Sequence, residues 1–459
     1  MILRRIAIAL ALATAWYSSH AATDAAKVWQ VGTFDGSSAE FAQGEPHQPV
    51  VFVVGHDRPS TGWFAFAPSA LPGKPSDENT APRTIVFSVP DKPGPAYRLT
   101  ASLIIERSSV PALRVGINGR TGLFYLHPKL DYAMGDMTAA FDPAYSKAEV
   151  TFDFPGSWLK SGRNQVTLQA VATADEGVPD AGFNYDAIGL ESLASLPVGV
   201  DAHAEPTIFY QTHGAGIDER VDVFVCYAEH PHAGHVELAI GSHTWTKPLA
   251  GGQDFGEERI QFQVPEFTGQ TAAHMTVDMD GHPSQFTETL QPQKKWTLFM
   301  VPHVHLDVGY TDYQAKVSAI QSRILDEAMD QTAQHPAFRF STDGEWNLEQ
   351  FLKSRSPEDQ QRVIEAIRKQ QLYVPAESSN VLTGFPTAET LIRSLYPSAD
   401  FSRAHGTPFN YANITDVPSY SWSYASILAA AGLPYFLAGS NNDRAPVLLL
   451  GHLNENSPF

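Results

Sequence analysis

The sequence has a single cysteine, Cys226, among 459 residues. A disulfide within the chain needs a second cysteine and a thiolate metal cage needs several, so both are excluded. Basic residues are also scarce, because 31 Lys and Arg stand against 50 Asp and Glu and give a formal net charge of −19. Nucleic acids and anionic membranes are bound through clustered positive charge. The composition therefore argues against either partner.

Long apolar runs are scarce, and the clearest one lies at the N-terminus. Residues 6–15 are predominantly apolar and follow Arg4 and Arg5, but the run is shorter than the ~20 residues of a membrane-spanning helix. Ser19-His20-Ala21 places small residues at positions −3 and −1 of a cleavage site. We therefore predict a signal peptide over 1–21, cleaved after Ala21. The mature protein is expected to be periplasmic or secreted, with no membrane anchor.

The remaining composition indicates a folded, multidomain protein. Hydrophobic residues make up 43% of the chain and aromatic residues 11%, which is more than a disordered acidic chain contains. The 33 Gly, 33 Pro and 16 Tyr favour turn-rich β structure over helical bundles. At roughly 100–200 residues per domain, the length predicts two to four domains.

The first two thirds of the chain have the pattern of short strands. Turn residues separate apolar runs over 27–192, and Asn118-Gly119 is a strong hairpin signal. This zone is expected to be a β-sandwich or a jelly roll. A second strand-rich zone, 193–292, has the size of an immunoglobulin-like sandwich. The predicted strands are 50–54, 84–89, 97–105, 113–117, 165–170, 221–227, 235–240 and 259–264.

The pattern changes after residue 292. Residues 296–302 are mostly apolar, which predicts a parallel strand buried on both faces. Helical and strand patterns then alternate, which predicts an α/β domain over 296–459 with a parallel sheet or barrel. The predicted helices are 313–334, 345–370, 387–404 and 422–431, and the predicted strands are 338–341, 372–374, 410–414 and 434–437.

Three potential metal ligands follow the first of these strands. His303, His305 and Asp307 alternate along an extended segment, so their side chains could share a face. They lie at the carboxyl end of a parallel strand, where such folds place their active sites. Imidazole and carboxylate ligands without sulfur suit Zn²⁺ or a similar divalent ion. The alternative is a histidine cluster that only bonds to local loops, and spacing alone leaves both open.

The same segment resembles a known family. Residues 303–313 read His-Val-His-Leu-Asp-Val-Gly-Tyr-Thr-Asp-Tyr. This resembles the opening motif of glycoside hydrolase family 38, the α-mannosidases, with Tyr310 at the position of the family's Trp. Residues 345–352 and 414–422 are similar to later blocks of that family. The resemblance implies a β/α barrel of seven strands. It also implies that His305 and Asp307 are zinc ligands and that His303 and Tyr310 lie at the substrate.

The chain departs from the family at the nucleophile. The family has an Asp in the stretch that corresponds to 377–386, whereas this sequence has none there, and Gly384 or a neighbour takes its place. A retaining glycosidase needs two carboxylates about 5–5.5 Å apart. Glu377 or Asp416 could substitute. Asp416 is the better candidate for the acid or nucleophile, although it could equally be a turn residue or the N-cap of the next helix.

Two other acidic residues and the end of the sequence complete this comparison. Asp343 and Glu345 follow a predicted strand and are interpreted as helix caps rather than catalytic groups. The family's remaining zinc ligand and its later β domains would follow residue 459. The resemblance therefore implies an incomplete barrel and a truncated chain.

The first zone carries a second resemblance. Residues 28–36, Val-Trp-Gln-Val-Gly-Thr-Phe-Asp-Gly, are similar to the carbohydrate-binding jelly-roll domain of polysaccharide lyase family 4, the rhamnogalacturonan lyases. Residues 158–164 and 185–190 agree with it in order. This implies that the zone binds carbohydrate, with exposed aromatic side chains stacking on sugar rings. The alternative is that the same aromatic residues pack in the core.

The sequence therefore predicts an exported, carbohydrate-active protein, and most specifically a metal-dependent glycoside hydrolase acting on a polysaccharide or glycan. Two alternatives remain. One is a carbohydrate-binding protein whose barrel is degenerate or truncated. The other is a metal-dependent polysaccharide deacetylase, which would release acetate instead of a reducing sugar.

Overall fold

The structure is a computed structural model, and the chain in it forms two compact units. Among the described residues the first unit runs to Trp296 and the second begins at Thr297. The predicted signal peptide, 1–21, lies outside the described residues. The structure describes residues 26–71, 77–89, 91–105, 110–127, 129–130, 146–173, 182–196, 199–214, 216–417 and 420–439.

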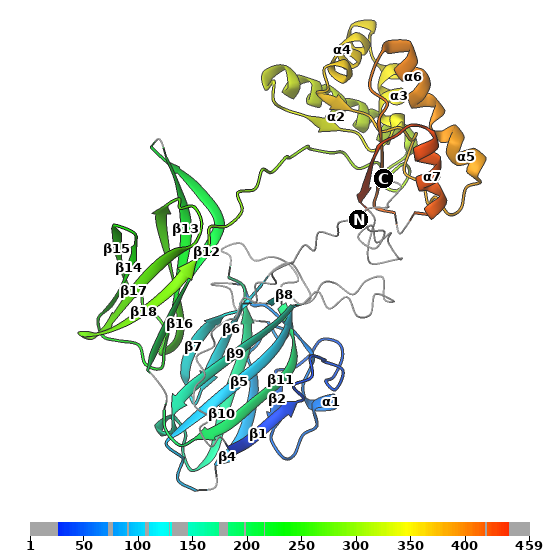
Figure 1. The fold of residues 1–459 in the computed structure, drawn as a ribbon. Helices are drawn as coiled ribbons and strands as arrows, with labels where there is room; N and C mark the ends of the chain where they lie inside the picture. The colour runs from blue at the N-terminus through cyan, green and yellow to red at the C-terminus, as the bar shows by residue number, and fades with distance from the viewer. Residues whose placement is uncertain are drawn as a thin grey trace, which may run out of the picture. The chain divides into compact units, whose positions relative to one another are not determined.

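The first unit is built from strands, whereas the long helices are confined to the second unit (Figure 1). The predicted all-β character of the N-terminal region is therefore confirmed. Its first part contains β1 (Ala26–Gly32), β2 (Val51–Val53), α1 (Pro59–Gly62), β3 (Phe66–Pro68), β4 (Arg83–Val89), β5 (Ala96–Ile105), β6 (Ala112–Ile117), β7 (Arg120–Tyr125), β8 (Lys129–Leu130), β9 (Ser146–Pro155), a 3₁₀ turn (Gly156–Trp158), β10 (Gly162–Val171) and β11 (Gly182–Leu193).

Two sheets enclose the core of this first part. One has the order β1-β11-β5-β9-β8, with β3 beside β11. The other contains β7-β6-β10-β4-β2. The hairpin predicted at Asn118-Gly119 is confirmed: β6 and β7 pair antiparallel with Ile117 opposite Arg120. Both turn residues have positive φ, 48° and 94°, as a type I′ turn requires, and that twist matches the twist of the strands.

The second part of the unit is a smaller pair of sheets. Its strands are β12 (Val200–His213), β13 (Gly216–Tyr227), β14 (Gly234–Ile240), β15 (His243–Pro248), β16 (Phe255–Pro265), β17 (Thr271–Met279) and β18 (His282–Leu290). One layer is β12-β13-β16 and the other is β15-β14-β17-β18. Burial alternates along the strands, as at Ala273, Met275 and Val277 of β17, because successive side chains point to opposite faces of a sheet.

The two parts of the first unit share a sheet and part of a core. Strand β16 pairs in parallel with β7, with Phe255 opposite Gly122. The Phe255 ring is fully buried and lies 4.8 Å from the Phe152 ring and 4.9 Å from the Trp158 ring, centroid to centroid. A Cβ atom at Gly122 would lie 2.5 Å from the Phe255 ring, so this position requires glycine. The second part is thus anchored in the core of the first.

The second unit alternates helices with short parallel strands, as predicted. Its elements are α2 (Gln314–Gln334), β19 (Phe340–Ser341), α3 (Glu345–Ser354), α4 (Pro357–Arg368), β20 (Leu372–Tyr373), α5 (Ala388–Ser394), α6 (Tyr396–His405), β21 (Tyr411–Thr415), α7 (Trp422–Ala430) and β22 (Tyr435–Gly439). Strand β19 pairs with β20 and β21 pairs with β22, both in parallel. The amide of Ala376 donates to the carbonyl of Tyr411 at 2.9 Å and joins the two pairs. A closed barrel of seven strands is not established by the described residues.

The helix predicted over 345–370 is two helices. Pro357 has no amide hydrogen, so it starts α4 instead of continuing α3. The side chain of Ser356 caps α4 by accepting a hydrogen bond from the amide of Asp359. The same chemistry divides the predicted helix 387–404, where Pro397 lies in the first turn of α6.

The strand predicted over 296–302 is wrong for most of its length. The run has no regular structure and its apolar side chains are exposed, with Trp296 66% and Phe299 84% accessible. Only the last residue of the run is paired with a strand: the carbonyl of Pro302 accepts a hydrogen bond from the amide of Ser341 at 3.0 Å. A buried parallel strand needs neighbours along both edges and helices over both faces. The described residues supply one neighbour, the two-residue β19. None of the described helices has the length and apolar character that crossing a bilayer demands.

Candidate functional site

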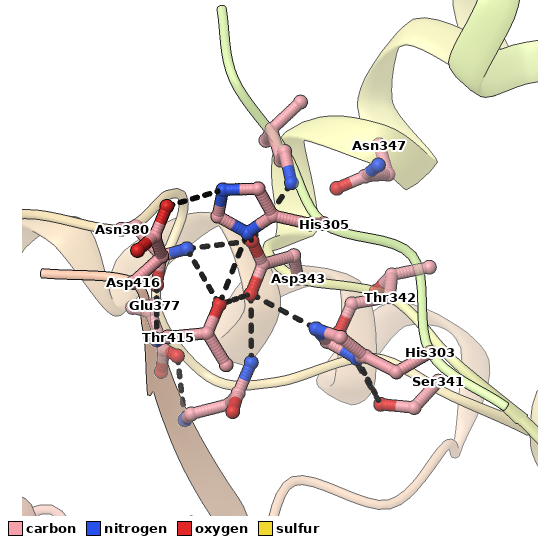
Figure 2. A network of polar contacts seen from close by, with 12 residues as sticks. His303, His305, Ser341, Thr342, Asp343, Asn347, Glu377, Asn380, Thr415 and Asp416 are labelled. Carbon is pink, nitrogen blue, oxygen red and sulfur yellow. Dashed lines mark hydrogen bonds and ion pairs between the residues drawn. The ribbon is translucent and has the colours of Figure 1, made fainter. Parts of the chain in front are cut away.

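Polar side chains gather where the parallel strands of the second unit end. His303 forms a bridge to Ser341 in β19, Asp343 follows β19, and Thr415 is the last residue of β21. Because parallel strands present their carboxyl ends at one edge, residues far apart in sequence meet there. Figure 2 shows these groups pointing toward one another around the Asp343 carboxylate.

Asp343 is the centre of this network. Its side chain is fully buried and accepts hydrogen bonds from four donors. These are the amide of Leu306 (2.8 Å), Asn380 Nδ2 (2.6 Å), Asn413 Nδ2 (2.9 Å) and Thr415 Oγ1 (2.5 Å). A buried carboxylate with this many donors is fully satisfied in its charged form.

Both motif histidines contact the same carboxylate. His303 Nε2 lies 3.1 Å from Asp343 Oδ1, and His305 Nδ1 lies 2.9 Å from Asp343 Oδ2. Burial raises the pKa of Asp343, but hydrogen bonds from His303, Thr415 and the amide of Leu306 outweigh it and hold the pKa below its ordinary value. Asp343 is therefore an anion that holds both imidazole rings in place.

The contact with Asp343 directs the other nitrogen of His305 outward. His305 Nε2 lies 3.4 Å from Asp307 Oδ1 and 3.4 Å from Asp416 Oδ2. Two ligand atoms that are each about 2.1 Å from a tetrahedral ion are about 3.4 Å apart. His305 Nδ1 is also 3.3 Å from Thr415 Oγ1, its hydrogen-bond partner, and metal-binding histidines commonly have their second nitrogen held in this way. Nitrogen and oxygen donors suit a divalent cation, and His305 and Asp307 supply one of each, with Asp416 beside His305.

Asp416 lies in the exposed part of the site. It follows β21 with a positive φ of 51°, and its amide donates to the carbonyl of Gly439 at 2.8 Å. Its side chain is 53% exposed. The alternative interpretation as the N-cap of the next helix is wrong, because α7 begins at Trp422 and Ser421 occupies its N-cap position.

The capping interpretations of Asp343 and Glu345 are also wrong. Gly344 is the N-cap of α3 and no side chain caps that end. Asp343 is instead the centre of the network. Glu345 is the first residue of α3 and is buried, and burial raises its pKa to about 7. The charges that act on Glu345 are Glu349 and Lys353, one and two turns further along the same helix.

Glu377 does not replace the missing nucleophile. Its side chain is buried, and one oxygen accepts from the amide of Asn413 at 2.5 Å. The other oxygen has no hydrogen-bond partner among the described residues. Burial raises the pKa of Glu377 well above its ordinary value, which disfavours the charged form of this group.

Of the remaining predicted residues, His303 lies in the network and Tyr310 is exposed to solvent. His303 belongs to the network through Asp343 and lies 3.4 Å from Ser341 Oγ. Tyr310 is 90% exposed on the loop after Asp307 and lies outside the network. The structure therefore brings His303, His305, Asp307 and Asp416 together and leaves Tyr310 apart.

Sequence reasoning missed three network residues in addition to Asp343. Asn380, Asn413 and Thr415 bond directly to its carboxylate. Asn413 and Thr415 alternate at the end of a predicted strand, so they could have been recognised as lying on one face. Asn380 lies in the stretch where the resembling family has its nucleophile, and its amide could have been considered a replacement.

Comparisons with known proteins agree with the two resemblances. Residues 27–190 match the family model for polysaccharide lyase family 4, domain III, a domain of the carbohydrate-binding-module type. Residues 295–442 match the model for the glycosyl hydrolases family 38 N-terminal domain. Both resemblances inferred from the motifs are confirmed, in the predicted order. The two matches together define a carbohydrate-active protein.

Other comparisons add little. No curated protein matches the chain. A GH2 β-galacturonidase from Eisenbergiella tayi bound to galacturonate has 11% identity and a TM-score of 0.23, covering 78% of this chain and 73% of that one. The exo-chitosanase CsxA of Amycolatopsis orientalis has 12% identity and a TM-score of 0.18, covering 82% and 46%. A putative β-galactosidase from Bacteroides fragilis has 13% identity and a TM-score of 0.21, covering 76% of this chain and 52% of that one. TM-scores this low do not establish a common fold.

Proposed function

We propose that this chain is a metal-dependent glycoside hydrolase of the α-mannosidase type, exported from the cytoplasm, whose β domains bind carbohydrate. One observation supports the enzyme most directly. Asp343 lies 2.9 Å from His305 Nδ1, and the opposite nitrogen of His305 lies 3.4 Å from the carboxylates of both Asp307 and Asp416. A buried anion that orients an imidazole toward two accessible carboxylates is the arrangement of a metal-binding site.

The proposed roles follow from these contacts. His305 and Asp307 would hold the cation, and their nitrogen and oxygen donors suit Zn²⁺. When bound, the cation would orient neighbouring sugar hydroxyls and stabilise the charge of an oxocarbenium-like transition state. Asp343 fixes the tautomer and ring orientation of His305. His303 holds Asp343 from the other side and is 24% exposed, so its ring edge can also contact a sugar.

Asp416 is the proposed acid or nucleophile. It is the exposed carboxylate of the site, so it can approach a glycosidic bond, which the buried Asp343 and Glu377 cannot. A carboxylate in this role either donates a proton to the leaving oxygen or attacks the anomeric carbon.

A non-catalytic carbohydrate-binding protein is the second candidate. It is favoured by Asn380, which places a neutral amide in the network from the stretch where the family has its Asp nucleophile. Such a protein would retain the metal and a sugar but not hydrolyse the bond.

The deciding experiment measures zinc content and hydrolysis of aryl α-mannosides by the purified chain and by H305A/D307A. The proposed enzyme binds zinc through these two residues and releases the aryl group only with zinc bound. Zinc lost in the double variant, together with no hydrolysis of any aryl glycoside by the wild type, would leave the binding protein as the function. Acetate release from acetylated polysaccharide would indicate the deacetylase. Export predicts that N-terminal sequencing of the mature protein starts at Ala22.

A further inference from the structure

A second group of metal-binding side chains lies in the first unit, far from the motif in sequence. His127 follows β7, His203 and Glu205 belong to β12, and Glu257 belongs to β16. Donor atoms of His127, His203 and Glu257 all lie within 4.8 Å of one another. None of these residues was selected from the sequence, because they come from three separate strands.

Strand geometry brings the group together. His203 and Glu205 are two residues apart in β12, so their side chains point to the same face. One oxygen of Glu257 accepts from the amide of Tyr125 at 2.9 Å, which fixes this carboxylate next to the segment that carries His127.

The Phe224 ring packs against both histidine rings. It stacks on His203 with a centroid distance of 5.1 Å and meets His127 edge to face at 4.6 Å. The two imidazole rings are themselves 5.1 Å apart, centroid to centroid. Packing therefore restricts the rotation of both rings, and a site is already formed before any ligand arrives.

The distances within the group include one hydrogen-bond separation and two longer contacts. Glu205 Oε1 lies 3.2 Å from His127 Nδ1 and 3.7 Å from His203 Nε2, and Glu257 Oε2 lies 3.7 Å from His127 Nε2. A separation of 3.7 Å is too long for a hydrogen bond. The buried Nε2 atom of His127 accordingly has no hydrogen-bond partner among the described residues. Ligand atoms around a tetrahedral ion are about 3.4 Å apart.

We propose that His127, His203 and Glu257 bind a divalent transition-metal cation of the Zn²⁺ type, and that Glu205, at Nδ1 of His127, orients this ring. Two imidazoles and a carboxylate without sulfur are a donor set that suits this ion, and imidazole ligands disfavour Ca²⁺ and Mg²⁺. The two carboxylates balance the charge of the cation. In the described part of the chain their ion pairs are with histidines, so no Lys or Arg competes for them.

The consequence is a cross-link within the first unit. His127 follows β7 of the first sandwich, whereas His203 and Glu257 belong to strands of the second. The cation would hold the two sandwiches together at the place where β16 pairs with β7. The role is structural, and it is independent of the proposed hydrolase site.

The competing state of the same group is a protonated histidine without metal. Burial alone lowers the pKa of His127, but the adjacent carboxylates of Glu205 and Glu257 outweigh burial and raise the pKa to about 9. An imidazolium between two carboxylates is a stable ion pair in its own right, and it would exclude a cation. Direct measurement of binding separates the two states.

The test uses the full chain with H305A/D307A as the background, so that zinc bound at the proposed hydrolase site does not contribute. After removal of metal with a chelator, zinc chloride is titrated by calorimetry, and the bound zinc is measured by mass spectrometry. We expect about one zinc per chain and a higher midpoint of thermal unfolding with zinc. Cobalt substitution is expected to give the visible absorption of a tetrahedral site.

Three further variants define the ligands. H203A and E257Q are expected to weaken zinc binding by at least about tenfold. E257Q retains an oxygen that can accept from Tyr125, so it should remain folded. H213A is the matched control, because His213 lies on the same strand as His203 and its Nδ1 atom lies 2.9 Å from Asp218. H213A should bind zinc as the background does. Absence of stoichiometric zinc in the background, or equal loss in H213A and H203A, would overturn the proposal in favour of the ion pair.

Discussion

The Nδ1 atom of His305 lies 2.9 Å from a carboxylate oxygen of Asp343, and Asp343 is fully buried. This contact joins the exposed motif to the interior of the second unit. It decides which nitrogen of His305 is turned toward Asp307, and it makes a residue 38 positions further along the chain part of the site.

The substitution D343N tests the orientation of His305. Asparagine has nearly the shape of aspartate, but it carries no charge. Its NH₂ group would face hydrogen-bond donors that now face a carboxylate oxygen. We expect metal affinity at the His305 site to fall 10–100-fold, as for other residues that orient a metal ligand. We also expect the free energy of unfolding to fall by about 3 kcal/mol, because the amide cannot accept from all the donors that face the carboxylate. Zinc titration and urea denaturation measure the two effects.

D312N is the control for D343N. Asp312 belongs to the same segment, but it is partly exposed and pairs with Lys316. D312N should leave the zinc affinity and the free energy of unfolding close to those of the wild type. If D343N retains full zinc affinity, His305 is not oriented by Asp343 in the way described.

The pair D307N and D416N separates metal binding from chemistry. Asp307 is proposed to hold the cation, so D307N should lose zinc and activity together. Asp416 is proposed to act on the glycosidic bond, so D416N should retain most of the zinc and lose at least about 1,000-fold in kcat. Zinc content and steady-state hydrolysis are measured on the same preparations. Loss of zinc in D416N to the extent seen in D307N would make Asp416 a ligand instead.

Glu345 makes the second unit sensitive to pH. Burial raises its pKa from 4.5 to about 7 in the folded protein. Between these values the folded state binds more protons than the unfolded state, so the contribution of Glu345 to stability decreases as the pH rises through this range. E345Q removes the ionisable group. It should be more stable than the wild type at pH 8 by on the order of 1 kcal/mol and nearly equal to it at pH 4.5.

Urea denaturation at pH 4.5, 6 and 8 checks this prediction. E389Q is the matched control, because Glu389 also lies in the first turn of a helix of the second unit but is exposed and pairs with Arg393. It should not change the slope of stability against pH. A wild type and an E345Q variant that differ equally at all three pH values would contradict the raised pKa.

Phe255 is predicted to couple the two sandwiches of the first unit. It comes from β16 but packs on Phe152 and Trp158 in the core of the other sandwich. F255A should lower the free energy of unfolding by about 3–5 kcal/mol and should increase hydrogen exchange in β9 as well as β16. F262A removes an equally buried ring from the same strand, but one that packs in the second core. Exchange in β9 that rises equally in both variants would show that Phe255 has no special coupling role.

Much of the secondary structure could be predicted because its causes are local. The Asn118-Gly119 hairpin forms since these residues tolerate positive φ, and α2 forms along its apolar period, with Val317 and Leu325 on the buried face. The run 296–302 shows the limit of such reasoning. Its composition suits a buried strand, but burial depends on neighbours that the run itself does not specify.

The sequence by itself determined the all-β character of the first unit, the alternation of helix and strand in the second, and the motif with His303, His305 and Asp307. These follow from side-chain periodicity and turn chemistry over a few residues. The tertiary structure alone decided that Asp343 is the centre of the site, that Glu377 is a buried acid, and that His127 meets His203. Such contacts depend on strand order and on which side chains lose solvent, and both are properties of the folded chain as a whole.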